Sequence, residues 1–209
     1  MKIHSGMNKD NTALIVIDPI NSCAHEKCET PDWNIHFSKI RKMLPKLNNF
    51  LKQYRKQVGG LVVVTTITPW TKEYLADNLN ELYKDPGAEY YSEDTTGFDE
   101  QFYTVEVQKS DLVIAKNTYD VFTNKKLLEE LQGRGVKYIV IAGIFSDGCV
   151  LASVIGGFSH GYNFVILKDL IETTDQDERQ QLQKLLIDVT FPKMYGRTVD
   201  SDSFLAEMS

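Results

Sequence analysis

The sequence predicts an α/β fold in which a doubly wound, mainly parallel sheet lies between layers of helices. Short runs rich in Val and Ile recur along the chain without polar alternation, and helical stretches lie between them. Runs of this kind are typical of strands buried on both faces, as in a parallel sheet. Right-handed crossovers then place helices on both faces of that sheet. The five runs span residues 13–17, 61–64, 112–114, 138–142 and 164–167.

Three stretches carry the spacing of amphipathic helices: residues 37–57, 124–133 and 174–188. In the first, apolar residues fall three and four positions apart, and the pattern ends at Gly59-Gly60, as a helix end should. The last begins with a Thr-Thr-Asp cap. We expect this last helix to turn Leu182, Leu185 and Leu186 inward.

The segment 85–110 is rich in Tyr, Glu, Asp and Thr and has weak periodicity, so it is predicted to be a loop with short elements. The chain contains no internal repeat, no low-complexity tract and no linker long enough to separate two domains. Residues 1–209 are therefore expected to form a single domain with a sizeable core.

The charge and the cysteine content of the chain limit the partners and the cellular location that are expected for this protein. The 29 acidic residues outnumber the 23 basic ones, so nucleic acid and anionic membranes are not expected partners. Near the N-terminus the apolar run Ala13–Ile17 is too short for a signal peptide or a bilayer span, which favours a cytoplasmic protein. The three cysteines are an odd number, and free thiols are expected.

Polar residues follow three of the predicted strands. Asp18 comes directly after the first run, Lys116 follows residues 112–115, and Cys149 lies just beyond the run 138–142. Because the carboxyl ends of parallel strands meet at one edge of a sheet, these three side chains are expected to converge there.

Each of these residue types suits one part of a nucleophilic reaction. The apolar and small residues 150–158 predict a buried helix with Cys149 at its N-terminus. A thiol attacks a carbonyl well only as its thiolate, and this helix N-terminus and the charge of Lys116 both favour that form. Asp18 can accept the thiol proton and later deliver it to a leaving amine. Each residue taken alone also has a structural interpretation: Asp18 as a turn or cap residue, and Cys149 as an inert core thiol.

Three segments, residues 13–21, 113–122 and 141–150, resemble the signature segments of the isochorismatase-like cysteine hydrolases. The resemblance extends in the family's order from Ala13 to about Phe204. It implies a six-stranded parallel sheet in a three-layer α/β/α sandwich, with Asp18, Lys116 and Cys149 as the catalytic triad. It also implies a cis peptide bond between Ile144 and Phe145, an oxyanion hole formed by the backbone N–H groups of Phe145 and Cys149, and a homo-oligomer, either a dimer or a tetramer.

Departures from the family pattern narrow the expected chemistry. Nicotinamidases of the family carry a metal-binding Asp-x-His with a further His, whereas this chain has Thr65-Thr-Ile-Thr-Pro-Trp70 there, so neither a metal nor another cofactor is expected. Isochorismatases proper typically lack the cysteine. The presence of Cys149 favours hydrolysis of an amide or ureido C–N bond of a small molecule through a thioester. A vinyl ether hydrolase and a catalytically idle binding subunit are the alternatives.

Other candidate residues lie near these segments. Trp70, Tyr119 and Phe122 are predicted either to line the substrate pocket or to pack at its rim. Cys23, His25 and Cys28 offer three zinc ligands, but their spacing matches no common structural site and no fourth ligand is evident. They are therefore expected to be solvated loop residues.

Overall fold

The computed structural model describes residues 6–67, 75–82, 98 and 101–208, which contain one six-stranded sheet with all neighbouring strands parallel. The strand order is β3-β2-β1-β4-β5-β6, so the chain builds outward from β1 and then returns to add β4 to β6 on its other side. This order confirms the predicted doubly wound sheet, and its switch point lies between β1 and β4. The strands are β1 (Thr12–Ile17), β2 (Leu61–Thr66), β3 (Leu112–Ala115), β4 (Tyr138–Ile144), β5 (Asn163–Glu172) and β6 (Gly196–Val199).

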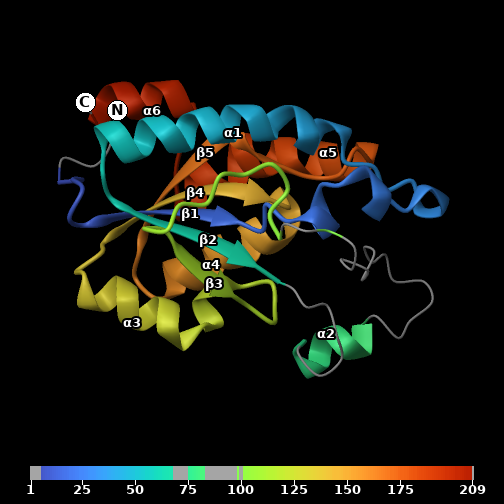
Figure 1. Ribbon diagram of the computed structural model, residues 1–209, viewed down its shortest axis with the longest axis horizontal. Helices are drawn as coiled ribbons and strands as arrows, with labels where there is room; N and C mark the ends of the chain where they lie inside the picture. Colours follow the sequence, from blue (N-terminus) through green and yellow to red (C-terminus); the bar gives the residue numbers. More distant parts are fainter. Residues whose placement is uncertain (1–5, 68–74, 83–97, 99–100, 209) are drawn as a thin grey trace.

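Helices cover both faces of the sheet, with α1 and α6 on one face and α3 and α4 on the other (Figure 1). The helices of the described residues include none that is long and apolar enough to cross a membrane. The α-helices are α1 (Ser38–Gln57), α2 (Asp77–Leu82), α3 (Lys125–Gly133), α4 (Leu151–Ser159), α5 (Asp177–Leu185) and α6 (Ser201–Met208). Two π-helical segments, η5 (Ser146–Val150) and η6 (Leu186–Tyr195), and four short 3-10 turns, η1 (Asn21–Cys23), η2 (Glu26–Cys28), η3 (Pro31–Trp33) and η4 (Val121–Thr123), complete the described elements.

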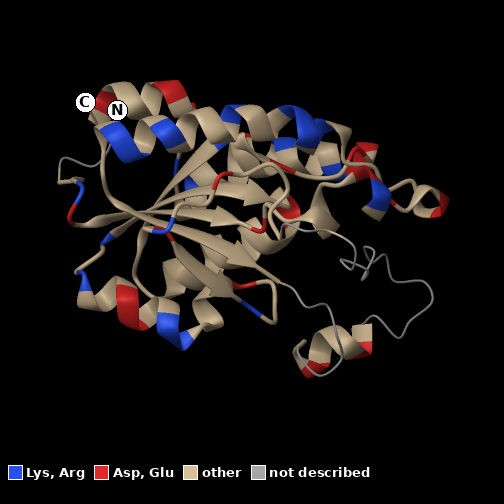
Figure 2. Cartoon of the chain, in the orientation of Figure 1, with Lys and Arg blue, Asp and Glu red and all other residues tan. Residues whose placement is uncertain are grey.

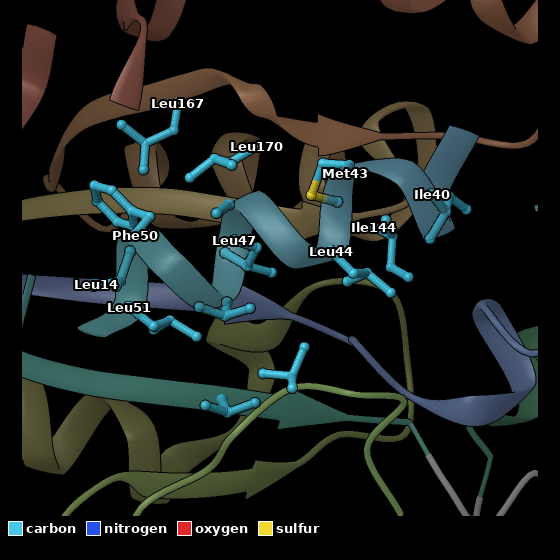
Figure 3. Packing of buried hydrophobic residues seen from close by; sticks show 14 of the residues in the cluster. Leu14, Ile40, Met43, Leu44, Leu47, Phe50, Leu51, Ile144, Leu167 and Leu170 are labelled. Atoms are coloured by element: carbon cyan, nitrogen blue, oxygen red, sulfur yellow. The ribbon is translucent and has the colours of Figure 1, made fainter. Parts of the chain in front are cut away.

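The hydrophobic core consists of one layer on each face of the sheet. Alternate side chains of β1 point to opposite layers, so Leu14 packs under α1 while Ile15 packs on the side of α3 and α4. Figure 3 shows Leu44, Leu47 and Leu51 of α1 lying over the sheet, as their three- and four-residue spacing predicts. Each fully buried side chain of this size stabilises the fold by roughly 1.5–3 kcal/mol.

The first predicted helix is confirmed as α1, and it carries Lys and Arg but no Asp or Glu (Figure 2). Four of its seven cations form ion pairs with carboxylates of other segments. The ion pairs are Arg41–Glu29 (2.7 Å), Lys46–Asp169 (2.5 Å), Lys52–Glu106 (3.1 Å) and Arg55–Asp111 (2.5 Å).

The interpretation of the segment 174–188 is wrong in two respects. The helix α5 starts later, after Gln176, and the Thr-Thr-Asp segment does not cap it. Asp175 instead accepts hydrogen bonds from the backbone N–H groups of Ser38 (3.1 Å) and Lys39 (3.0 Å) at the start of α1.

The inward face of α5 is also polar rather than apolar. Leu182 and Leu185 are 43% and 58% exposed, and only Leu186 of the three expected leucines is buried. The reason is that α5 lies along the carboxyl edge of the sheet, where its polar side chains, not its leucines, face the turn that carries Cys149.

Two further expectations of full burial are wrong. Strand β3 is the last in the strand order, and its Val113 is 40% exposed because one face of this edge strand is uncovered. The helix after Cys149, α4, buries Val154 but leaves Ile155 and Phe158 41% and 47% exposed.

Candidate active site

Asp18, Lys116 and Cys149 lie together at the carboxyl edge of the sheet, as the sequence predicts. Asp18 follows β1, Lys116 follows β3, and Cys149 lies in η5, directly after β4. The Nζ atom of Lys116 is 2.8 Å from Oδ2 of Asp18 and 3.2 Å from Sγ of Cys149. The ammonium group therefore contacts both the carboxylate and the thiol.

Asp18 is held in place by strand β2. The hydroxyl of Thr65 donates to Oδ1 of Asp18 (2.6 Å) and accepts from the backbone N–H of Asp18 (3.0 Å). Asp18 has a φ of 45°, a left-handed conformation that is uncommon for a residue other than glycine. Nearby, a Cβ at Gly143 would lie 2.2 Å from the carbonyl oxygen of Ile17, so β1 and β4 approach closely only because that position is glycine.

Lys116 is a fully buried cation. Besides Asp18 and Cys149, its Nζ atom donates to the carbonyl of Thr118 (3.1 Å), and its backbone N–H donates to the carbonyl of Thr66 (2.8 Å). Burial alone would lower the pKa of Lys116, but the negative charge of Asp18 and the contacts with Asp18 and Cys149 outweigh burial and raise it. The lysine is therefore an ammonium ion at any physiological pH.

Cys149 is 7% exposed and lies in a π-helical turn that runs directly into α4. The carbonyl of Phe145 accepts from the N–H groups of both Gly148 (3.0 Å) and Val150 (3.1 Å), which fixes the turn around the thiol. Burial raises the pKa of Cys149 to about 12, and the charge of Lys116 opposes this shift without cancelling it. The residue is therefore a thiol at rest, whereas the sequence favoured a thiolate.

The peptide bond between Ile144 and Phe145 is cis, at the position that the family resemblance implies. The ring of Phe145 stacks on Phe37 of the α1 layer with ring centroids 6.0 Å apart. The role of the Phe145 and Cys149 N–H groups as an oxyanion hole stays a prediction.

The three predicted pocket residues have different surroundings. Tyr119 is partly buried next to the Lys116 loop and packs against both core layers. Phe122 is 1% exposed and packs against Tyr162 and Phe164, with ring centroids 5.4 and 6.2 Å apart, so the structure places it in the core. Trp70 lies outside the described residues.

The expectation that Cys23 and Cys28 are solvated is wrong. Neither is part of a disulfide, and they are 6% and 1% exposed because the turns η1 and η2 fold them against the α1 layer of the core. His25 lies between them with its ring against Phe98, and its Nδ1 accepts from the N–H of Lys27. Within the described part of the chain, no three His, Cys, Asp or Glu side chains are grouped as metal ligands.

Thr65 is the site residue that sequence reasoning missed. In the sequence, its position indicates only that the metal-binding motif of the nicotinamidases is lacking there. Strand pairing offers the signal that could have found it, because Val16 pairs with Val64, which brings Thr65 beside the end of β1. A hydroxyl at the end of the neighbouring parallel strand is well placed to bind a carboxylate there.

Residues 12–194 match the model of the Isochorismatase domain. The chain belongs to the isochorismatase family. It is therefore a hydrolase of that family, with the six-stranded α/β fold that its sequence resemblance implies.

Among related proteins, the chain is similar to the ureidoacrylate amidohydrolase RutB of Klebsiella pneumoniae, with 23% identity over 95% of this chain and 87% of that protein. Its fold is similar to a cysteine hydrolase from Pseudomonas syringae pv. phaseolicola, with a TM-score of 0.79, 16% identity and coverage of 100% and 97% of the two chains. It is also similar to N-carbamoylsarcosine amidase from Thermoplasma acidophilum, with a TM-score of 0.62, 19% identity and coverage of 94% and 98%.

Proposed function

We propose that this isochorismatase-family hydrolase cleaves an amide or ureido C–N bond of a small molecule, with Cys149 as the nucleophile. The observation that carries the proposal is the contact of one buried ammonium, that of Lys116, with both the Asp18 carboxylate (2.8 Å) and the Cys149 thiol (3.2 Å). The names of two similar proteins, an amidohydrolase acting on ureidoacrylate and an amidase acting on N-carbamoylsarcosine, support C–N hydrolysis.

The proposed first half-reaction starts from the neutral thiol. Asp18 takes the proton of Cys149 as Sγ attacks the substrate carbonyl, and the backbone N–H groups of Phe145 and Cys149 bind the developing oxyanion. The C–N bond then breaks, and Asp18 gives the proton to the leaving nitrogen, which departs as ammonia or an amine. The product on the enzyme is a thioester, or a thiocarbamate when the substrate is a ureido compound.

Water completes the reaction in the second half. Asp18 accepts a proton from the attacking water, the C–S bond breaks, and the thiol is restored. Lys116 stays positively charged throughout the reaction. Its charge orients Asp18 and stabilises the negative charge as it moves between the carboxylate, the sulfur and the oxyanion. No step assigned to these residues calls for a metal ion or an organic cofactor.

A panel of small amides and ureido acids, screened for released ammonia or amine, tests the proposal. We expect turnover by the wild-type protein and at least a thousandfold loss in Cys149→Ala and in Asp18→Asn, with folded proteins by circular dichroism. Cys28→Ala is the matched control, because it removes a buried thiol from the core without touching the triad.

Two results would contradict the proposal. Full turnover by Cys149→Ala together with loss in Asp18→Asn would indicate chemistry that depends on the carboxylate alone, as in a vinyl ether hydrolase. A wild-type protein that binds members of the panel and turns over none of them would indicate a catalytically idle binding subunit.

A further inference from the structure

The turn that carries the nucleophile is held from outside by helix α5. Two side chains one helical turn apart, Arg179 and Gln183, point at it. Arg179 binds the carboxylate of Asp147 through Nε (2.7 Å) and through its terminal nitrogen (2.8 Å), and Ser146 donates to Oε1 of Gln183 (2.6 Å).

Arg179 also lies over Phe145, with the guanidinium carbon 5.2 Å from the centre of the ring. A guanidinium group stacked on an aromatic ring and paired through two nitrogens with a carboxylate has a single favourable orientation. The three consecutive residues Phe145, Ser146 and Asp147 are thus each fixed by α5, two to four residues before the nucleophile.

The Asp147–Arg179 pair is shielded from solvent, so the attraction between its charges is screened less than that of a surface ion pair. The side chains of Asp147 and Arg179 are 6% and 19% exposed, and the hydroxyl of Thr173 donates to the same carboxylate (2.6 Å). Removal of the arginine would leave the largely buried Asp147 carboxylate without its cation. An unpaired buried charge is unfavourable, so the carboxylate would move toward solvent and displace the turn.

We propose that Arg179 is a positioning residue, which fixes the direction of the Phe145 and Cys149 N–H groups by clamping the intervening turn through Asp147 and the Phe145 ring. The inference rests on the proposed function, because those N–H groups are the proposed oxyanion hole. Loss of one oxyanion donor slows an acyl transfer about 100- to 1000-fold, and a displacement of about 1 Å has an effect of about 100-fold. These contacts of Arg179 with Asp147 and the Phe145 ring, here called the clamp, therefore affect the chemical step and not substrate affinity.

The test compares Arg179→Met with Arg179→Lys and with Gln180→Met. Gln180 is the matched control, because it lies on the same helix but binds Glu172 (3.0 Å) and the Thr174 carbonyl (2.9 Å), not the turn. We expect Arg179→Met to lower kcat by roughly 30- to 100-fold with KM changed by less than about threefold. Arg179→Lys should recover only part of the loss, since an ammonium group cannot bind the carboxylate through two nitrogens.

A second measurement separates positioning from loss of structure. Alkylation of Cys149 by iodoacetamide needs the thiolate of Cys149 but no oxyanion hole, so its rate in Arg179→Met should stay within about threefold of the wild type. Unchanged kcat in Arg179→Met would overturn the proposal, and so would parallel losses of kcat and alkylation. If Arg179→Met does not fold, Asp147→Asn replaces it in both assays, with the same expected results.

Backbone hydrogen exchange tests the clamp even if no C–N substrate is found. Amides of residues 144–150 should exchange at least about tenfold faster in Arg179→Met than in the wild type, and at the wild-type rate in Gln180→Met. Equal exchange in Arg179→Met and wild type would refute the clamp itself, whereas faster exchange in a protein without amidase activity would refute only the proposed function.

Discussion

At the residue scale, the site depends on a carboxylate that is held from two sides. Thr65 fixes one oxygen of Asp18, and Lys116 contacts the other. Buried ionic groups of this kind are weak contributors to stability, because desolvation offsets their attraction. Their arrangement is therefore better explained by chemistry than by folding.

The Thr65 hydroxyl should matter for activity. Thr65→Val is expected to lower kcat/KM by roughly 10- to 100-fold, because Asp18 loses the hydrogen bond that aims it. The unpaired N–H and carboxylate oxygen should also lower the free energy of unfolding by about 1–3 kcal/mol. Steady-state kinetics and urea denaturation measure the two effects. Thr65→Ser keeps the hydroxyl and should retain most of the activity, and equal losses in both variants would argue against this role.

The protonation state of Cys149 should be visible in its reactivity. Because burial raises the pKa of Cys149 to about 12, the thiolate fraction rises about tenfold for each pH unit below that value. The alkylation rate of the free enzyme should therefore climb from pH 7 to pH 10 with no plateau. Mass spectrometry of the modified peptide measures it. A plateau beginning near pH 7 would mean that Lys116 outweighs burial and that the thiolate exists at rest.

At the scale of elements, α5 contacts the active-site turn, whereas η6 contributes to the hydrophobic core. The polar residues of α5 hold the nucleophile turn, while Leu186, where η6 begins, packs into the core layer of α3 and α4. As a result, of the three leucines at positions 182, 185 and 186, only Leu186 points inward.

The adjacent residues Leu185 and Leu186 therefore allow a direct comparison of an exposed and a buried leucine. Leu186→Ala should lower the free energy of unfolding by about 2–4 kcal/mol, since it removes a buried side chain and leaves a cavity. Leu185→Ala, at a side chain that is 58% exposed, should change it by less than about 0.5 kcal/mol. Chemical denaturation of the two variants measures both values, and similar losses would contradict the observed orientation of the helix.

At the scale of the whole molecule, exposed apolar side chains gather on two neighbouring helical stretches, α4 and the continuous run of α5 and η6. Phe158 of α4 contacts Tyr195 of η6, with ring centroids 5.5 Å apart. Contiguous patches of exposed apolar side chains mark protein interfaces. They are Ile155, Phe158, Leu182, Leu185, Val189 and Met194, here called the apolar face.

We expect the apolar face to bind a second copy of this chain. Its α5 end carries the exposed Asp177 and Glu178 and its η6 end the exposed Lys193, so a two-fold antiparallel pairing sets acidic ends against basic ends. Light scattering should give at least a dimer for the wild type and a smaller species for Leu185→Glu. Leu82→Glu, at an exposed leucine on α2, is the control and should leave the mass unchanged. A monomeric wild type would contradict this prediction.

Much of the fold was predictable because it rests on local patterns. Buried runs predicted five of the six strands, whereas β6 matches no such run and a sixth strand was implied only by the family resemblance. The placement of Asp18, Lys116 and Cys149 after three of those runs predicted their convergence. What failed depends on contacts that no local pattern encodes. The burial of Cys23 and Cys28, the outward leucines of α5 and the bond from Thr65 to Asp18 are each set by a segment far away in the sequence.

The central claim is a covalent bond between Cys149 and the substrate carbon. Wild-type protein mixed with a substrate from the ureido or amide panel, quenched in acid within milliseconds to seconds and digested, gives the mass of each cysteine peptide over one turnover. The account predicts a transient acyl or carbamoyl adduct on the Cys149 peptide, with the Cys23 and Cys28 peptides unmodified. Product formation at full rate with no adduct on Cys149 at any time would contradict it.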